Sequence, residues 1–211
     1  MADPDPCTAQ KVRELCLKAG FSPGERQSAD LAGYLSLLMK WNRVMNLAGA
    51  STWREALENL VFDSFYLADL VRSLAPDEPE AWDLGAGAGL PGIPLRMLWQ
   101  KGSYWLVESR EKRALFLSTV LARHPLPGTR VFQGRAEEFM GGRQADIILS
   151  RAFMPQETLL PFIHDYLKPG GRAVLMRNAP AVFSHPWKDA GMVSYAIGGE
   201  KRFLCVAEKT A

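Results

Sequence analysis

Apolar residues recur at intervals of three and four along the first third of the chain, which is the spacing of amphipathic helices. The spacing predicts helices over residues 8–20, 25–44 and 53–73. Gly20 ends the first helix, the segment 46–50 interrupts the second, and a serine–threonine pair precedes the third as its cap. We therefore expect residues 1–75 to form an N-terminal helical cap.

From residue 80 onward the pattern changes to short apolar runs that alternate with amphipathic stretches. The runs predict strands at 80–84, 103–107, 129–133, 145–149 and 172–176, with helices at 92–100, 110–123, 155–167 and 181–190. Such alternation is typical of an α/β fold with a parallel sheet covered on both faces. Residues 192–197 and 202–207 flank Gly198-Gly199, which predicts an antiparallel ending and seven strands in all. We expect residues 76–211 to form this one domain.

Composition is that of an ordinary globular protein. The 211 residues include 47% hydrophobic and 23% charged residues, enough for one α/β domain with a small extension. No apolar run approaches the roughly 20 residues that span a bilayer. The polar, acidic segment 1–7 also lacks the apolar core of a signal peptide. We expect a cytoplasmic protein without a membrane partner, and a monomer.

Cysteine and histidine usage gives no sign of a metal site. Cys7, Cys16 and Cys205 are odd in number and widely separated, unlike a disulfide framework or a zinc-ligand spacing. The three histidines show no mutual spacing that suggests a catalytic triad either. We expect free thiols and no metal.

The formal net charge of +2 hides an uneven distribution along the chain. Residues 1–95 contain 8 Lys and Arg against 13 Asp and Glu, a net charge of −5. Residues 96–211 contain 17 against 10, a net charge of +7. The C-terminal part can therefore present a basic face to a polyanion, although a solvated surface of mixed charge gives the same composition.

The candidate chemistry centres on residues 81–92, AWDLGAGAGLPG, where a short apolar run enters a glycine-rich turn before a helix. Glycine allows positive φ and a close approach of the backbone to a ligand. Such a turn at the carboxyl end of a strand is where open α/β sheets bind ligands. The match of Gly87, Gly89 and Gly92 to G-x-G-x-x-G is weak alone, because nicotinamide and flavin binders share it.

Two neighbouring features narrow the choice of ligand. Asp83 lies two residues before Gly85, and Gly85, Gly87 and Gly89 alternate along an open loop. Glu108 ends the second strand, where a carboxylate can accept hydrogen bonds from both hydroxyls of a ribose. A nucleoside-containing ligand fits this pattern.

The spacing Asp83-x-Gly85-x-Gly87-x-Gly89 resembles motif I of class I S-adenosylmethionine-dependent methyltransferases. The longer segment 84–95, LGAGAGLPGIPL, resembles the RsmG (GidB) family of 16S ribosomal RNA guanine-N7 methyltransferases. Further matching segments, in the family's order, are 41–42, 46–47, 63–64, 107–109, 112–113, 116–117, 134–137 and 150–152. The resemblance implies a Rossmann-like fold, S-adenosyl-L-methionine as cofactor, S-adenosyl-L-homocysteine as product, and small-subunit ribosomal RNA as partner.

The resemblance also implies roles for individual residues. The implied cofactor-binding residues are Asp83, Gly85, Gly87, Gly89, Leu90, Glu108, Ser109, Ala136, Glu137 and Arg151, with Glu108 on the ribose and Ala136 and Glu137 against the adenine. The implied catalytic residues are Asn46, Arg151 and Arg202, and the implied substrate contacts are Asn46, Arg177 and Arg202.

Two positions depart from the family pattern. Leu60 replaces a usual histidine, and Arg177 replaces a usual lysine, which changes a point charge into a planar fork.

Simpler structural roles stay open for the same side chains. Glu108 fits a solvated helix start, and Arg151 fits a surface arginine at a helix start. Asn46 fits a helix C-cap, and Arg202 fits a cross-strand charge. Lys112 and Arg113 fit either a solvated helix face or a phosphate contact.

The implied reaction agrees with the absence of a histidine pair. Guanine N7 carries an in-plane lone pair, so its attack on a sulfonium methyl requires no general base. The enzyme's contribution is alignment, which supplies roughly 7–11 kcal/mol in well-oriented reactions. N7 is poorly accessible in the deep A-form groove, so we expect an unpaired target nucleotide, in naked RNA or in a ribosomal particle.

Three other functions remain open at this point. A methyltransferase that acts on another RNA or on a small molecule fits the weak net charge and the two departures. A nicotinamide-dependent oxidoreductase fits Gly87-x-Gly89-x-x-Gly92. A non-catalytic RNA-binding protein fits the basic C-terminal part. Binding of S-adenosylhomocysteine against NAD, and transfer of methyl to RNA, separate these alternatives.

Overall fold

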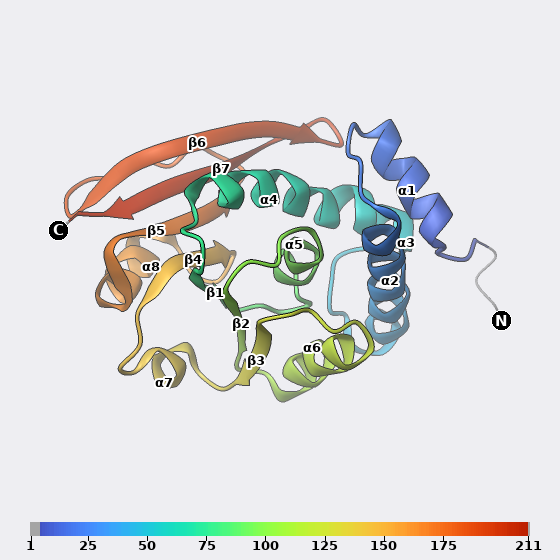
Figure 1. The fold of residues 1–211 in the computed structure, drawn as a ribbon, viewed down its shortest axis with the longest axis horizontal. Helices are drawn as coiled ribbons and strands as arrows, with labels where there is room; N and C mark the ends of the chain where they lie inside the picture. Colours follow the sequence, from blue (N-terminus) through green and yellow to red (C-terminus); the bar gives the residue numbers. More distant parts are fainter. Residues whose placement is uncertain (1–4, 211) are drawn as a thin grey trace.

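The computed structural model describes residues 5–210. The helices of the N-terminal segment lie together beside a sheet that the rest of the chain forms (Figure 1). The N-terminal helices are α1 (Ala9–Lys18), α2 (Glu25–Met45), α3 (Trp53–Ala56) and α4 (Phe62–Leu74), and a π-helical turn, η1 (Leu57–Val61), joins the last two. Thr8 and Thr52 cap α1 and α3 by accepting hydrogen bonds from the main-chain N–H groups of Lys11 and Glu55. The predicted helix 53–73 is therefore helical throughout, with a change of hydrogen bonding at η1.

Seven strands form one sheet in the order β3-β2-β1-β4-β5-β7-β6. They are β1 (Glu80–Leu84), β2 (Ser103–Glu108), β3 (Thr129–Gln133), β4 (Ala145–Arg151), β5 (Leu167–Arg177), β6 (Trp187–Ile197) and β7 (Glu200–Lys209). The first five strands run parallel, β7 lies antiparallel to β5, and β6 pairs antiparallel with β7. The predicted seven-stranded, mostly parallel sheet with an antiparallel last strand is confirmed.

The remaining helices connect the strands. They are α5 (Gly92–Leu98), α6 (Glu111–Arg123), α7 (Ala136–Met140), α8 (Gln156–Ile163) and the 3₁₀ turn η2 (His164–Tyr166). The sequence pattern did not predict α7, because five residues are too few to show a helical period. Among the helices between residues 5 and 210, none is long and apolar enough to cross a membrane.

The predicted helix at 181–190 is wrong. Residues 178–186 are not helical, and β6 begins at Trp187. Pro186 cannot donate the main-chain hydrogen bond that a helix would need there. Pairing with β7 from Trp187 onward satisfies the following main-chain groups instead.

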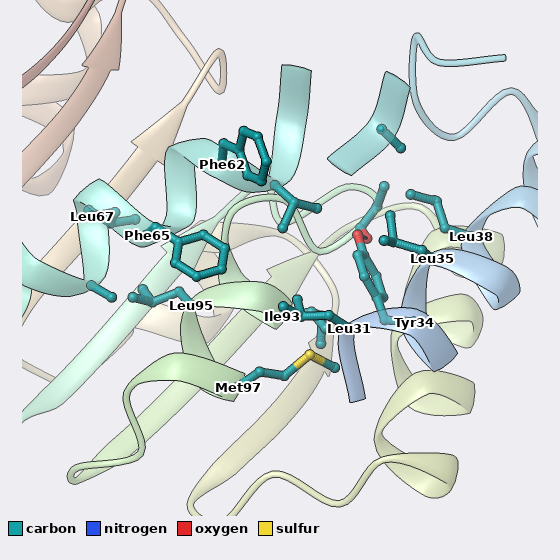
Figure 2. Packing of buried hydrophobic residues seen from close by; sticks show 14 of the residues in the cluster. Leu31, Tyr34, Leu35, Leu38, Phe62, Phe65, Leu67, Ile93, Leu95 and Met97 are labelled. Atoms are coloured by element: carbon teal, nitrogen blue, oxygen red, sulfur yellow. Dashed lines mark hydrogen bonds between the residues drawn. The ribbon is translucent and has the colours of Figure 1, made fainter. Parts of the chain in front are cut away.

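The side chains of β1 alternate between two hydrophobic clusters, one on each face of the sheet. Ala81 belongs to a cluster with residues of α2, α4, α5 and α6. Trp82 and Leu84 belong to a second cluster with residues of α7 and α8. Figure 2 shows the first cluster, to which the N-terminal helices contribute side chains such as Leu31 and Phe65. The predicted cap thus shares a core with the sheet, and a domain boundary at residue 75 stays a prediction.

Two hydrogen bonds tie the cap to the glycine loop after β1. The Tyr34 hydroxyl of α2 donates to the carbonyl oxygen of Ala88 at 2.8 Å, and the Ser64 hydroxyl of α4 donates to that of Pro91 at 3.1 Å. Burial raises the pKa of the Tyr34 phenol far above its ordinary value, so the phenol stays a donor. The cap therefore fixes the position of main-chain groups in the loop.

Removal of the Tyr34 hydroxyl tests this attachment. Tyr34→Phe leaves the buried Ala88 carbonyl without its partner, which is expected to reduce the free energy of unfolding by about 1–3 kcal/mol. Urea denaturation measures the change. Tyr166→Phe is the matched control, because within residues 5–210 the Tyr166 hydroxyl has no hydrogen-bond partner. Equal stability of the two variants would contradict the assignment.

Candidate functional site

The predicted site residues lie along the carboxyl edge of the parallel strands. β1, β2, β4 and β5 end at Leu84, Glu108, Arg151 and Arg177, and the glycine loop follows the first of them. The sheet order reverses direction between β1 and β4, and such a switch point is where doubly wound sheets bind ligands. Two arrangements at this edge, the glycine loop with its pocket and a cluster of charged side chains, contain most of the predicted site residues.

The first arrangement is the glycine loop itself. Gly85, Gly87 and Gly89 have φ values of 72°, 58° and 77°, which disfavour any residue with a side chain. The N–H groups of Gly85 and Ala86 donate to the Val107 carbonyl oxygen at 2.9 and 3.0 Å, so the loop follows the end of β2. These bonds fix the direction in which the loop leaves the sheet.

The glycines of the loop serve different purposes. A Cβ atom on Gly87 would meet nothing closer than 3.7 Å, so this part of the loop is open to a ligand. A Cβ atom on Gly89 would collide with Ile93 and would lie 2.9 Å from Leu117, so Gly89 permits close packing of the loop on α5 and α6. A ligand can approach the loop at Gly87 rather than at Gly89.

Glu108 holds the loop by its side chain. One carboxylate oxygen, Oε2, accepts the N–H of Gly87 at 2.8 Å, and the other, Oε1, accepts the N–H of Arg110 at 2.8 Å. The residue is only 4% exposed. Each oxygen has more than one lone pair, so the fixed carboxylate retains acceptor capacity for hydroxyl groups.

A pocket of about 170 Å³ lies beside the loop and brings together four of the predicted cofactor residues. Gly85, Ser109, Ala136 and Glu137 line it, together with Phe153. The Phe153 ring lies over Gly85, because its Cδ2 atom is 2.6 Å from the place of a Gly85 Cβ. The pocket therefore combines an apolar aromatic wall with a carboxylate and main-chain groups.

Asp83 lies beneath the loop rather than in this pocket. It is 2% exposed, and it faces the hydroxyl of Tyr104 and the N–H of Gly92. Burial raises its pKa to about 7, while the Tyr104 hydroxyl and the Gly92 N–H act in the opposite direction. Neither group makes a hydrogen bond of good geometry with Oδ2, which explains why burial has the larger effect.

The second arrangement joins two predicted catalytic residues, Arg151 and Arg202, through a third residue. Nη2 of Arg151 lies 3.2 Å from Oδ2 of Asp63, and Nη1 of Arg202 lies 2.7 Å from the same oxygen. The Tyr195 hydroxyl donates to Oδ1 of Asp63 at 2.9 Å. Asp63 is 2% exposed and belongs to α4, whereas its three partners belong to β4, β6 and β7.

The π-helical turn η1 supplies additional acceptors for the two arginines. Arg202 donates from Nη1 to the carbonyl oxygen of Asn59 at 2.7 Å, and Arg151 donates from Nη1 to that of Leu60 at 3.4 Å. A π turn changes the regular pairing of helical carbonyls, which is one reason why such turns occur at functional sites. The guanidinium groups thus face fixed acceptors from the cap.

The remaining predicted substrate residues, Asn46 and Arg177, line other hollows of the surface. Asn46 ends α2 in the left-handed conformation, with φ of 47°, so the helix C-cap role is confirmed. It lines a groove with the first turn of α6. Arg177 lines another pocket, of about 240 Å³, where its guanidinium donates to the side-chain oxygen of Gln156. Within the described part of the chain, no three His, Cys, Asp or Glu side chains are grouped to hold a metal ion.

Comparison with known proteins decides the family. The family model described as rRNA small subunit methyltransferase G matches residues 27–182. The protein of that name from Lawsonia intracellularis is 49% identical over 206 residues, covering 95% of each chain. The one from Nitratidesulfovibrio vulgaris strain DP4 is 54% identical over 179 residues, covering 84% of this chain and 82% of the relative. The chain belongs to the rRNA small subunit methyltransferase G family.

Solved structures agree with this family at the level of the fold. A candidate O-methyltransferase from Klebsiella pneumoniae has a TM-score of 0.63 at 13% identity, covering 95% of this chain and 97% of that chain. An rRNA methylase from Streptococcus thermophilus has a TM-score of 0.53 at 16% identity, covering 69% of this chain and 95% of that chain. At such low identity the likeness shows the shared fold alone.

The structure of this family member adds three site residues that the sequence reasoning missed. Asp63 lay in the segment 63–64 that resembled the family pattern, but it was assigned no role in the site. Phe153 and Tyr195 gave no signal, because long-range packing alone brings them to the site. The contact from Arg151 uses the main-chain oxygen of Leu60, so the departure from histidine at that position does not affect this bond.

The buried Asp83 predicts a pH dependence of stability. Its pKa is about 7 in the folded protein and about 4 in the unfolded chain, so the folded state binds the extra proton between these values. The free energy of unfolding is expected to fall as the pH rises from about 4 to about 7.

Asp83→Asn removes this titration. The stability of the variant relative to wild type is expected to rise across the same interval by up to about 4 kcal/mol, at 1.36 kcal/mol per unit of pKa shift. Chemical denaturation at a series of pH values measures the difference. Parallel pH profiles for the two proteins would show that Asp83 does not titrate in this way.

Proposed function

We propose that this protein transfers a methyl group from S-adenosyl-L-methionine to N7 of a guanine in small-subunit (16S) ribosomal RNA. Membership of the rRNA small subunit methyltransferase G family supports the reaction class and the RNA substrate. The structural observation that carries the proposal is the carboxylate of Glu108, which two N–H groups fix beside the open part of the glycine loop. This is the acceptor that a ribose requires.

The residues present fit the proposed cofactor. Glu108 would hold the ribose hydroxyls, and Ser109, Ala136 and Glu137 would surround the adenine in the pocket that they line. The loop from Gly85 to Leu90, with Gly87 at its open part, would receive the methionine portion. When bound, this cofactor supplies an electrophilic methyl group on a positively charged sulfur.

Two predicted cofactor residues have a supporting role in this proposal. Gly89 allows the loop to pack on α5 and α6, and Asp83 lies under the loop next to Gly92. Both residues shape the main chain that the cofactor would contact. Neither Gly89 nor Asp83 has to contact the ligand with a side chain in order to fill this role.

The protein's own task in the reaction is alignment. Guanine N7 needs no deprotonation, so the residues around the site have to place the base in line with the reacting methyl group. Such positioning lowers a barrier by roughly 7–11 kcal/mol when it is complete. No residue has to act as a general base, because N7 of the purine already carries a free lone pair.

Arg151 and Arg202 are suited to hold the RNA side of the site. Arginine can bind guanine O6 or a phosphate, and both contacts fix the register of the strand. The two guanidinium groups share the carboxylate of Asp63, and Arg202 also lies 3.8 Å from the exposed carboxylate of Glu200, so Arg151 is the less compensated cation of the two. Asn46 and Arg177 would contact other parts of the RNA from the hollows that they line, and Arg177 is pre-oriented by Gln156.

The cellular setting belongs to the same proposal. We infer a cytoplasmic enzyme from the proposed ribosomal RNA substrate, which is either free RNA or a ribosomal particle. The proposal assumes a monomer.

The Glu108 carboxylate provides a direct test of the cofactor site. Glu108→Gln keeps the shape of the side chain but removes its charge, so S-adenosylhomocysteine is expected to bind about 10- to 100-fold more weakly. Isothermal titration measures the affinity. Glu78→Gln, at an exposed position between α4 and β1, is the control and should bind as wild type does. Wild-type protein that binds NAD instead would indicate an oxidoreductase.

Arg151 provides the test of the RNA side. Arg151→Ala is expected to reduce methyl transfer at least about 100-fold through loss of alignment, while the fold is retained. Circular dichroism checks the fold, and Arg13→Ala on the exposed side of α1 is the control. Unchanged turnover on RNA would remove Arg151 from the site.

The function itself is tested with the wild-type protein. Labelled S-adenosylmethionine and small-subunit RNA lacking the modification are incubated with the enzyme, and the RNA is digested to nucleosides. The proposal predicts label in 7-methylguanosine. Label in another nucleoside would contradict the N7 assignment, and RNA binding without transferred label would indicate a non-catalytic RNA-binding protein.

A further inference from the structure

A groove between α2 and α6 runs alongside the glycine loop. Val44, Met45 and Asn46 at the end of α2 form one side of this α2–α6 groove. The segment 110–113, which leads into α6, forms the other side. The groove has a volume of about 600 Å³, the largest of the hollows described above at this edge of the sheet.

The groove is strongly basic. Arg110, Lys112 and Arg113 line it against one acidic residue, Glu111, and Arg43, the exposed residue before Val44, adds a cation to the end of α2. Over the described range 5–210, none of these four cations forms an ion pair with a protein carboxylate. Their charge is therefore available to a polyanion, and each phosphate that they neutralise releases counterions.

The groove is connected to the proposed cofactor site by two of its residues. Nη1 of Arg113 lies 3.9 Å from the place of a Gly87 Cβ, so its guanidinium borders the open part of the loop. The main-chain N–H of Arg110 binds Glu108, as described above. A polynucleotide strand bound in the groove would therefore extend to the edge of the site where the methyl group would lie.

The α2 side of the groove adds contacts that suit a sugar–phosphate chain. Val44 is 87% exposed and offers an apolar surface for van der Waals contact with ribose. Asn46 extends from a left-handed C-cap, and its amide has both a donor and an acceptor. Among the described residues that line the groove there is no aromatic ring, so the surface favours the backbone of an RNA strand rather than stacked bases.

We propose that the α2–α6 groove binds the sugar–phosphate backbone of an unpaired RNA segment that carries the target guanine. This inference rests on the proposed function, because it names the path by which the RNA reaches the glycine loop. Unpaired RNA is favoured, since N7 is poorly accessible in an A-form duplex.

The test uses the full-length double variant Arg110→Ala/Lys112→Ala. The Arg110 contact to Glu108 is made by the main chain, so the double substitution preserves it. Binding to single-stranded RNA is expected to weaken about tenfold or more at 0.1 M salt. The negative slope of log affinity against log salt is expected to decrease in magnitude by about 1.4, or about 0.7 for each lost contact. Affinity for S-adenosylhomocysteine is expected to remain within about twofold of wild type.

Arg123→Ala is the matched control, because this exposed cation lies at the other end of the same helix. It should change neither the affinity for RNA nor the salt slope. Equal RNA affinity and salt slope for the double variant and the control would overturn the groove assignment. A loss seen only with ribosomal particles and not with free RNA would also overturn it, in favour of a ribosomal protein.

Measurements of RNA affinity and of methyl transfer distinguish an error in the groove assignment from an error in the proposed function. RNA affinity is measured without methyl transfer, so a groove defect is visible even in an inactive protein. Wild-type protein that binds RNA through the groove but transfers no methyl group would contradict the proposed function alone.

Discussion

Hydrogen bonds from two directions fix the main chain of the loop after β1, and the rest of the site depends on them. On the sheet side, Val107 and Glu108 accept N–H groups of the loop. On the cap side, Tyr34 and Ser64 donate to its carbonyl oxygens. A glycine-rich segment loses more conformational entropy than any other on folding, so these bonds maintain a shape that the sequence of the loop alone would not hold. The cap is therefore part of the proposed cofactor site.

A second junction joins the cap to strands β4, β6 and β7 of the sheet. Asp63 accepts hydrogen bonds from Arg202 and Tyr195 and forms an ion pair with Arg151, and these partners come from three different strands. A buried carboxylate between two guanidinium groups is well compensated, whereas removal of the carboxylate would leave two cations close together. The π turn adds carbonyl acceptors to the same place. The proposed RNA-facing arginines are thus pre-positioned by the helices that hold the glycine loop.

The sequence predicted those features that depend on local pattern. The strands at 80–84 and 129–133 coincide with the structure because short apolar runs between turns have few alternatives. Glu108 was found because it ends a strand. The helix at 181–190 failed because residues from Trp187 onward pair with β7, while Ala181 and Phe183 pack against the second hydrophobic cluster without forming a helix. The roles of Asp63 and Phe153 were missed, since both arise from contacts between segments far apart in the chain, which no local period records.

A crystal structure with S-adenosylhomocysteine tests most directly the central claim that the fixed loop and Glu108 form a nucleoside site. The account predicts that the ribose hydroxyls bind Glu108 and that the adenine occupies the pocket lined by Ser109, Ala136 and Glu137. The loop itself should keep its present hydrogen bonds to Glu108 and Tyr34. A nucleoside bound elsewhere, with the Glu108 carboxylate in contact only with the Gly87 and Arg110 N–H groups, would contradict it.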